Sequence, residues 1–280
     1  VLAPAVPAAA VLALVLVPPS RLSESPDAPP LGYPNADAAL LVLAVGAACC
    51  AAWAAPGRAR RFGLRLTGVG AAVTALALGS AAGFAAGIAI TLSSLAAARM
   101  RHRLLGLAGL ALAAALAVGG SYAVAVDALP AGLSQSLTGQ LTQPRVDLWH
   151  QAVSLAERHP LRGVGPERFA DESGAPASST TPTEGSPQSA PLQLAAEQGL
   201  PGAALLAVAY GWLLCTLWRS SRSTPVVLTA GAALTGLAIL ATVDHVLSYP
   251  VVTAGAGFLA GTATARPLGD EDRGPVPPKE

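Results

Sequence analysis

Long hydrophobic runs dominate the chain and alternate with shorter segments that carry Pro, Ser or Arg. A helix needs about 20 apolar residues to cross the hydrocarbon core of a bilayer, with roughly 17 to 25 tolerated. The runs therefore predict an all-α, polytopic membrane protein with about eight membrane-spanning helices. These spans are predicted near residues 2–18, 37–55, 65–79, 82–98, 104–126, 197–218, 225–243 and 249–265.

The stretch 66–98 carries no charged side chain and is long enough for one very long helix or for two short ones. Gly79, Ser80 and Gly83 offer a turn near its middle. Arginines flank the stretch on both sides, and arginines gather on the cytoplasmic side of membrane proteins. A stretch with both ends on one side crosses an even number of times, so the pattern predicts a hairpin of two spans.

The arginines also predict the orientation of the chain. They cluster at 58–65, 99–103 and 219–222 and recur after residue 265. The positive-inside rule places these segments and both chain ends in the cytoplasm. The predicted organisation is a set of amino-terminal helices at 1–126, an external loop at 127–196, carboxy-terminal helices at 197–265 and a Pro-rich, disordered cytoplasmic tail at 266–280.

Composition excludes several other classes of protein. Hydrophobic residues make up 52% of the chain and charged residues 12%, whereas a soluble domain carries about a quarter charged residues. A net charge of +1 gives no support for nucleic-acid binding. Cys49, Cys50 and Cys215 lie within apolar runs and lack the spacing of zinc ligands or of a disulfide framework. We therefore expect contact with membrane lipids, and no nucleic-acid partner, metal or cofactor.

The predicted external loop contains an amphipathic helix at residues 143–159. Val146, Trp149 and Val153 recur at helical spacing and form one apolar face, and Pro160 ends the helix. Such a helix is expected to lie on the membrane surface, with Trp149 at the level of the lipid headgroups.

Four arginines in and after this helix run against the positive-inside bias: Arg145, Arg158, Arg162 and Arg168. One interpretation is a set of solvated charges. The other is a guanidinium cluster that binds phosphate oxygens in a bidentate manner at the outer leaflet. A diphosphate lipid carrier needs such a site, where the same arginines also stabilise the charge of the departing diphosphate.

His150, His159 and His245 are predicted to lie outside, each as an ordinary surface histidine or as a proton acceptor. His245 is the better candidate for a base that takes a proton from an acceptor hydroxyl, because it lies at a predicted helix end on the external side. Asp244 precedes it, but neighbouring residues of a helix point in different directions. We therefore do not expect Asp244 and His245 to form a dyad.

Two sequence motifs lie in and directly after the external loop. Arg145-x-x-x-Trp149 precedes the run HPLRGVGP at 159–166, and the run EQGLPG stands at 197–202. In their order and spacing, these motifs resemble the external loop and the following span of the O-antigen ligase / O-antigen polymerase superfamily.

The resemblance implies a metal-independent glycosyltransferase of the GT-C type in the cytoplasmic (inner) membrane. Such an enzyme takes a glycan from an undecaprenyl diphosphate carrier on the outer face and passes it to a hydroxyl of a glycan, lipid or protein acceptor. Arg145 matches the family's loop arginine and is implied to bind substrate and act in catalysis. Glu197 matches the second motif, Arg162 and Arg168 lie beside the first, and all three are implied to contact substrate. Family members have more spans, so we expect an amino-terminal segment to precede Val1.

One position departs from the family pattern. Four residues before Leu192, where the family carries a histidine, this chain has Gln188, which cannot act as a general base. Three interpretations follow. The motif is shifted in this variable loop, or His245 or His159 takes over, or the protein is inactive or binds a glycan lipid without transferring the glycan.

Other functions compete with that of a ligase. A polysaccharide polymerase uses a second carrier-linked repeat as the acceptor, whereas a transporter or an assembly subunit breaks no sugar bond. Transport commonly relies on charges at mid-membrane depth. The predicted spans hold almost none, and Glu197 and Asp244 lie at span ends. The pattern therefore favours transfer at the membrane surface over transport.

Overall fold

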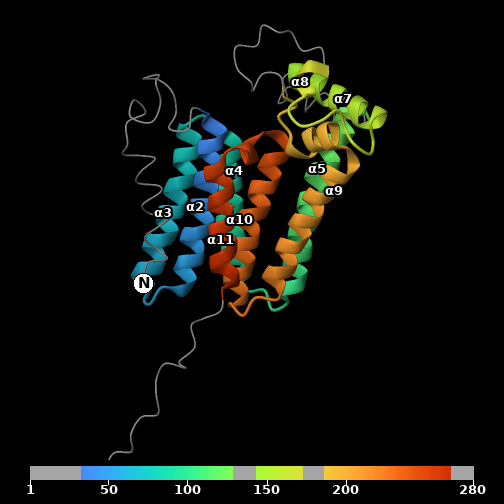
Figure 1. Ribbon diagram of the computed structural model, residues 1–280. Helices are drawn as coiled ribbons and strands as arrows, with labels where there is room; N and C mark the ends of the chain where they lie inside the picture. The colour runs from blue at the N-terminus through green and yellow to red at the C-terminus, as the bar shows by residue number, and fades with distance from the viewer. Residues whose placement is uncertain (1–32, 129–142, 173–185, 266–280) are drawn as a thin grey trace, which may run out of the picture.

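The computed structural model describes residues 33–128, 143–172 and 186–265, and in these residues it is a helical bundle without strands (Figure 1). The all-α fold predicted from the hydrophobic runs is confirmed. The elements are α2 (Pro34–Ala54), α3 (Arg58–Ala77), α4 (Ala81–Ala97), α5 (Arg103–Ala125), α7 (Gln143–Arg158), α8 (Phe169–Glu172), α9 (Ala190–Trp218), α10 (Thr224–Val243), the 3-10 helix η2 (Val246–Ser248) and α11 (Pro250–Thr264).

The core of the bundle lies around α2 and α10, whose apolar stretches are 72% buried, against 17% for α5 and α9. Helix α2 packs against α3, α4, α10 and α11, while α5 and α9 stand beside this group and contact α10 (Figure 1). Gly46 allows α2 to approach α10 closely, because a Cβ at this position would lie 2.3 Å from the Cβ of Ala233. Small residues at such contacts are typical of membrane helices, whose association depends on close packing.

Seven helices of the described residues stand at the positions of the predicted spans. Four of them, α2, α5, α9 and α10, are long and apolar enough to cross a membrane. The predicted turn within 66–98 is confirmed, because a turn with Gly79 at φ 89° separates α3 from α4, and the Ser80 hydroxyl caps α4 by accepting from the amide of Gly83. Whether α3 and α4 each cross a membrane stays a prediction. The predicted span at 2–18 lies outside the described residues, and the number of crossings stays a prediction.

The arginine-rich segments gather at one end of the bundle, and the segment 58–65 forms the first turns of α3 and not a loop. The guanidinium of Arg103 donates hydrogen bonds to the carbonyl oxygens of Trp218, Ser220 and Arg222, which joins the loop before α5 to the loop after α9. The loop between α2 and α3 lies at the same end, and α7 and α8 lie at the opposite end (Figure 1). The arrangement agrees with the two-sided topology that the arginines predict. Which side of the membrane each end faces stays a prediction, and the tail at 266–280 lies outside the described residues.

We expect the two ends of the bundle to react from opposite sides of the membrane. In a background without Cys49, Cys50 and Cys215, Glu157→Cys on the exposed face of α7 should react with an impermeant thiol reagent added to intact cells. Arg101→Cys, in the loop before α5, should react only after permeabilisation, because arginine-rich loops stay in the cytoplasm. Labelling of Arg101→Cys in intact cells would contradict this orientation.

Candidate functional site

Helix α7 is held against α9 and α5 by a small apolar core of its own. Trp149 is 1% exposed, and its indole Nε1 donates a hydrogen bond of 2.7 Å to the carbonyl oxygen of Pro187. The helix itself was predicted correctly, but the placement of Trp149 among lipid headgroups was wrong, because protein covers the apolar face of α7. The core consists of Ala125, Trp149, Ala152, Val153, Leu155, Phe169, Leu192 and Ala196.

The two sequence motifs, at 159–166 and 197–202, contact each other. Gly199 has a φ of 71° and interrupts helix α9, and Pro201 follows within the same helix. A break of this kind leaves backbone carbonyls without their usual partners four residues further on. The segment 160–165 supplies replacement donors, with amide-to-carbonyl hydrogen bonds of 2.9 Å to both Ala196 and Glu197. The first motif therefore fixes the end of α7 to the kink in α9.

Gly163 is expected to be essential for this contact. Its φ is 61°, and a Cβ at this position would lie 2.2 Å from the carbonyl carbon of Glu197, a backbone atom that cannot move aside. We predict that Gly163→Ala lowers the midpoint of thermal unfolding in detergent, with backbone strain alone costing roughly 1–3 kcal/mol. Gly211→Ala is the matched control, because Gly211 lies in open space on α9, where alanine favours the helix. Equal midpoints for the two variants would contradict this role of Gly163.

The side chain of Arg145, near the start of α7, contacts Gln188. Its Nε and Nη2 atoms both donate hydrogen bonds to Oε1 of Gln188, and the Nε to Oε1 distance is 3.1 Å. Gln188 has a φ of 47°, in the left-handed region that residues other than glycine rarely adopt. Trp149 holds the preceding residue through its indole. The residue that stands where a histidine was expected is therefore fixed beside the guanidinium group.

Asp244 and His245 form a close pair after α10, at the end of the bundle that carries α7 (Figure 1). Helix α10 ends at Val243, and Asp244 is extended, with φ −155° and ψ 163°. Because the two residues lie outside the helix, their side chains meet, and the imidazole Nδ1 lies 3.1 Å from the carboxylate Oδ1. The expectation that these neighbours point apart was therefore wrong. Both are buried, and within the described part of the chain neither ring nitrogen of His245 makes a hydrogen bond of good geometry, so Nδ1 meets the carboxylate only as a close ion-pair contact.

Two residues at the start of α2 donate hydrogen bonds to the carboxylate of Asp244. The Tyr33 hydroxyl lies 2.9 and 2.8 Å from its two oxygens, and the side-chain amide of Asn35 donates to one of them. Burial alone would raise the pKa of the Asp244 carboxyl, but hydrogen bonds from His245 and Tyr33 outweigh it and lower the pKa. Burial and the charge of Asp244 raise the pKa of Tyr33 to about 12. At neutral pH the carboxylate is therefore charged, and the phenol remains a donor.

Arg145 and this buried cluster lie at the same end of the bundle. The positive charge of Arg145 has only a small lowering effect on the pKa of Tyr33, against the larger raising effects of burial and of the Asp244 charge. Val243, at the end of α10, packs against the apolar core around Trp149. The structure thus brings two of the predicted site residues, Arg145 and His245, to one end of the bundle.

The other predicted site residues make different contacts. Glu197 is buried at the kink of α9 and accepts a hydrogen bond of 3.2 Å from the side chain of Gln193. Arg162 and Arg168 are exposed, and Arg168 pairs with Glu172 at 3.4 Å. Arg162 and Arg168 therefore face solvent, whereas two hydrogen bonds hold Arg145 to Gln188.

Tyr33 and Asn35 were missed as site residues by the sequence analysis. Tyr33 and its partner Asp244 are 211 residues apart, and a contact across that separation leaves no local pattern. The available signal was a Tyr-x-Asn pair directly before a hydrophobic run. Among the residues that the structure describes, no group of three or more His, Cys, Asp or Glu side chains could hold a metal ion.

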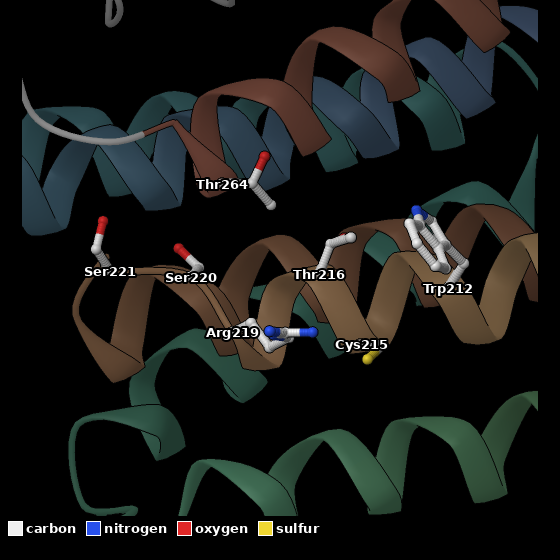
Figure 2. A pocket seen from close by; sticks show the side chains of 7 residues that line it. All are labelled: Trp212, Cys215, Thr216, Arg219, Ser220, Ser221 and Thr264. Carbon is white, nitrogen blue, oxygen red and sulfur yellow. The ribbon is translucent and has the colours of Figure 1, made fainter.

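A cleft of about 550 Å³ lies at the opposite end of the bundle, between α9 and α11 (Figure 2). Its lining holds one positively charged side chain, that of Arg219, and neither a carboxylate nor a histidine that could accept a proton. The chemistry therefore favours the Arg145 end as the candidate site. The residues that line the cleft are Trp212, Cys215, Thr216, Arg219, Ser220, Ser221 and Thr264.

A family model described as O-antigen ligase matches residues 32–207, which is more than half of the chain. The matched region includes Tyr33, Arg145 and Gln188, and it ends before Asp244 and His245. No curated protein and no solved structure matches the chain.

Proposed function

The chain belongs to the O-antigen ligase family, and from this premise we propose that it transfers a glycan from an undecaprenyl diphosphate carrier to an acceptor hydroxyl. The reaction takes place at the end of the bundle that carries α7, on the outer face of the cytoplasmic membrane. The observation that carries the proposal is the placement of Arg145 at the same end of the bundle as the buried cluster of Tyr33, Asp244 and His245. This placement combines a permanent positive charge with an imidazole supported by a carboxylate.

Arg145 binds the diphosphate of the donor. A guanidinium group is always charged, and its planar fork matches two phosphate oxygens at once. Its partner Gln188 is a neutral amide, so the contact orients the guanidinium without cancelling its charge. A carboxylate at position 188 would compete with the diphosphate for the same cation. The neutral partner therefore supports anion binding in preference to a structural ion pair.

The bond changes follow from these groups. The acceptor oxygen attacks the anomeric carbon of the glycan, and the bond from that carbon to the diphosphate oxygen breaks. The diphosphate departs with the electron pair, and Arg145 stabilises its added negative charge. The acceptor proton passes to Nε2 of His245, and the carboxylate of Asp244 stabilises the resulting imidazolium.

The acceptor distinguishes a ligase from a polymerase, and we propose a ligase because the matching family model carries that description. A ligase passes the glycan to a lipid or protein acceptor. A polymerase passes it to a second carrier-linked glycan. The donor side of the site, built around Arg145, serves both reactions equally.

Proteoliposomes that contain the protein and an undecaprenyl-diphosphate-linked glycan test the proposal. Release of undecaprenyl diphosphate together with glycosylation of an added lipid or protein acceptor supports the ligase. Growth of the carrier-linked glycan would replace the ligase with a polymerase. Movement of the donor across the bilayer without bond cleavage would indicate a transporter, and neither transfer nor movement would indicate an assembly subunit. Each of these last two results would contradict an enzyme.

A further inference from the structure

The carboxylate of Asp244 is held by donors from two distant parts of the chain. Tyr33 donates to its oxygens at 2.9 and 2.8 Å, and the side-chain amide of Asn35 donates to one of them. The backbone amide of His245 adds a fourth contact at 2.7 Å. The imidazole of His245 lies beside the same carboxylate and 4.7 Å from the Tyr33 ring, measured between centroids. The start of α2 thus determines how the carboxylate faces the imidazole.

We propose that Tyr33 and Asn35 are positioning residues, which hold the Asp244 carboxylate in the orientation that keeps Nδ1 of His245 protonated and Nε2 available as the proton acceptor. The inference rests on the proposed function, because it concerns the histidine that accepts the proton in the transfer. It assigns a role in proton transfer to two residues from the other end of the sequence.

The chemistry of the two donors suits this task. A buried carboxylate without hydrogen bonds tends to take up a proton and lose its charge. Tyr33 and Asn35 supply hydrogen bonds and no positive charge, so the carboxylate stays ionised while its charge is shared with His245. A carboxylate beside Nδ1 favours the tautomer with the proton on Nδ1 and the lone pair on Nε2. The pKa of Tyr33, about 12, keeps its hydroxyl a donor throughout the neutral range.

Other titratable groups around His245 are few in the described residues. Tyr249 lies 5.7 Å from the imidazole, measured between ring centroids, and its pKa is raised by burial and by the charges of Asp244 and Asp37. Arg145 acts on the cluster from α7, while α10 and α11 contribute no charged residue. Asp37, Tyr249 and Arg145 stay unchanged in the variants below, so a changed pH profile reports on the carboxylate.

The test compares Tyr33→Phe with Asp244→Asn in the proteoliposome transfer assay. Tyr33→Phe keeps the ring and removes one hydrogen bond to a charged group, so kcat should fall roughly tenfold. The unshared carboxylate charge then stabilises the imidazolium more strongly, and the midpoint of the rising limb of the pH–rate profile should move to higher pH. Asp244→Asn removes the negative charge, so the same midpoint should move to lower pH. A general loosening of the fold would not shift the two midpoints in opposite directions.

Two further variants keep the test decisive. Asn35→Leu has a similar size and lacks the donor, so it should move the midpoint upward as Tyr33→Phe does, even if Tyr33→Phe does not fold. Tyr122→Phe, on the exposed part of α5, is the matched control and should leave kcat and the profile unchanged.

The outcomes separate this inference from the proposed function. A wild-type protein that transfers no glycan would overturn the proposed function, and this inference with it. A wild-type protein that transfers glycan, together with unchanged kcat and an unchanged profile in Tyr33→Phe and Asn35→Leu, would overturn this inference alone. Midpoints that move in the same direction in Tyr33→Phe and Asp244→Asn would also overturn it. Opposite shifts would support it.

Discussion

Arg145→Ala is expected to lower the rate of glycan transfer by roughly 10²-fold or more, the usual effect of removing one group that stabilises a developing oxyanion. Arg145→Lys should also be damaging. The ammonium group keeps the charge, but it loses the fork that bonds Gln188 through Nε and Nη2 and that would bind two phosphate oxygens. The measurement is kcat and KM for the carrier-linked donor in proteoliposomes, at equal protein level.

Arg158→Ala is the matched control on the same helix. Arg158 is exposed, and its Nη2 atom bonds the hydroxyl of Ser154. Its loss removes one positive charge from α7 without touching Gln188, so transfer should stay close to that of the wild type. An Arg145→Ala variant with wild-type turnover would remove Arg145 from the mechanism.

The helices could be predicted from the sequence because the length and hydropathy of an apolar run identify a membrane helix. The hairpin of α3 and α4 followed from a different argument. Arginines on both sides of an uncharged stretch require an even number of crossings, and Gly79 and Ser80 supplied the turn. Both arguments use local composition and need no knowledge of which helices touch.

Trp149 shows where this kind of argument ends. The sequence pattern of an amphipathic helix predicts an apolar face, but it does not show whether lipid or protein contacts that face. The sequence places the second motif at 197–202, beyond the loop, and contains no sign that α9 packs on α7. The contact between segment 160–165 and the kink at Gly199 is what brings α9 there. That contact joins backbone groups that are distant in sequence, which a residue pattern cannot reveal.

Some residues of the candidate site could also be predicted from the sequence, and others could not. Arg145, Gln188 and His245 could be singled out from motifs and from their predicted side of the membrane. Their partners could not. The predicted span at 225–243 ends at the same residue as α10, but the sequence does not show that Asp244 adopts an extended backbone, with φ −155° and ψ 163°, which turns its side chain toward His245. Tyr33 joins the site only through the packing of α2 beside α10.

His245→Ala is expected to lower kcat for glycan transfer by roughly 10²-fold, the usual contribution of a positioned general base. A histidine accepts a proton only when its imidazole is neutral, so transfer by the wild type should rise with pH as the imidazolium deprotonates. The variant should lose this rising limb. His159→Ala is the matched control, because His159 is exposed after α7 and should be replaceable with little loss. Full rate and an unchanged pH profile in His245→Ala would place the base elsewhere, or show that the departing diphosphate makes one unnecessary.

Gln188→His, introduced into the His245→Ala background, is expected to recover part of the lost transfer. Position 188 lies against the guanidinium of Arg145, so an imidazole there would stand beside the diphosphate site. Its backbone, at φ 47°, lies in a region that histidine adopts more readily than most residues. Recovery together with a restored rising limb in the pH profile would show that the family's usual position is intact in this chain and lacks only its base. No recovery, in a double variant with the thermal midpoint of its parent, would mean that proton transfer here depends on the pairing of His245 with Asp244.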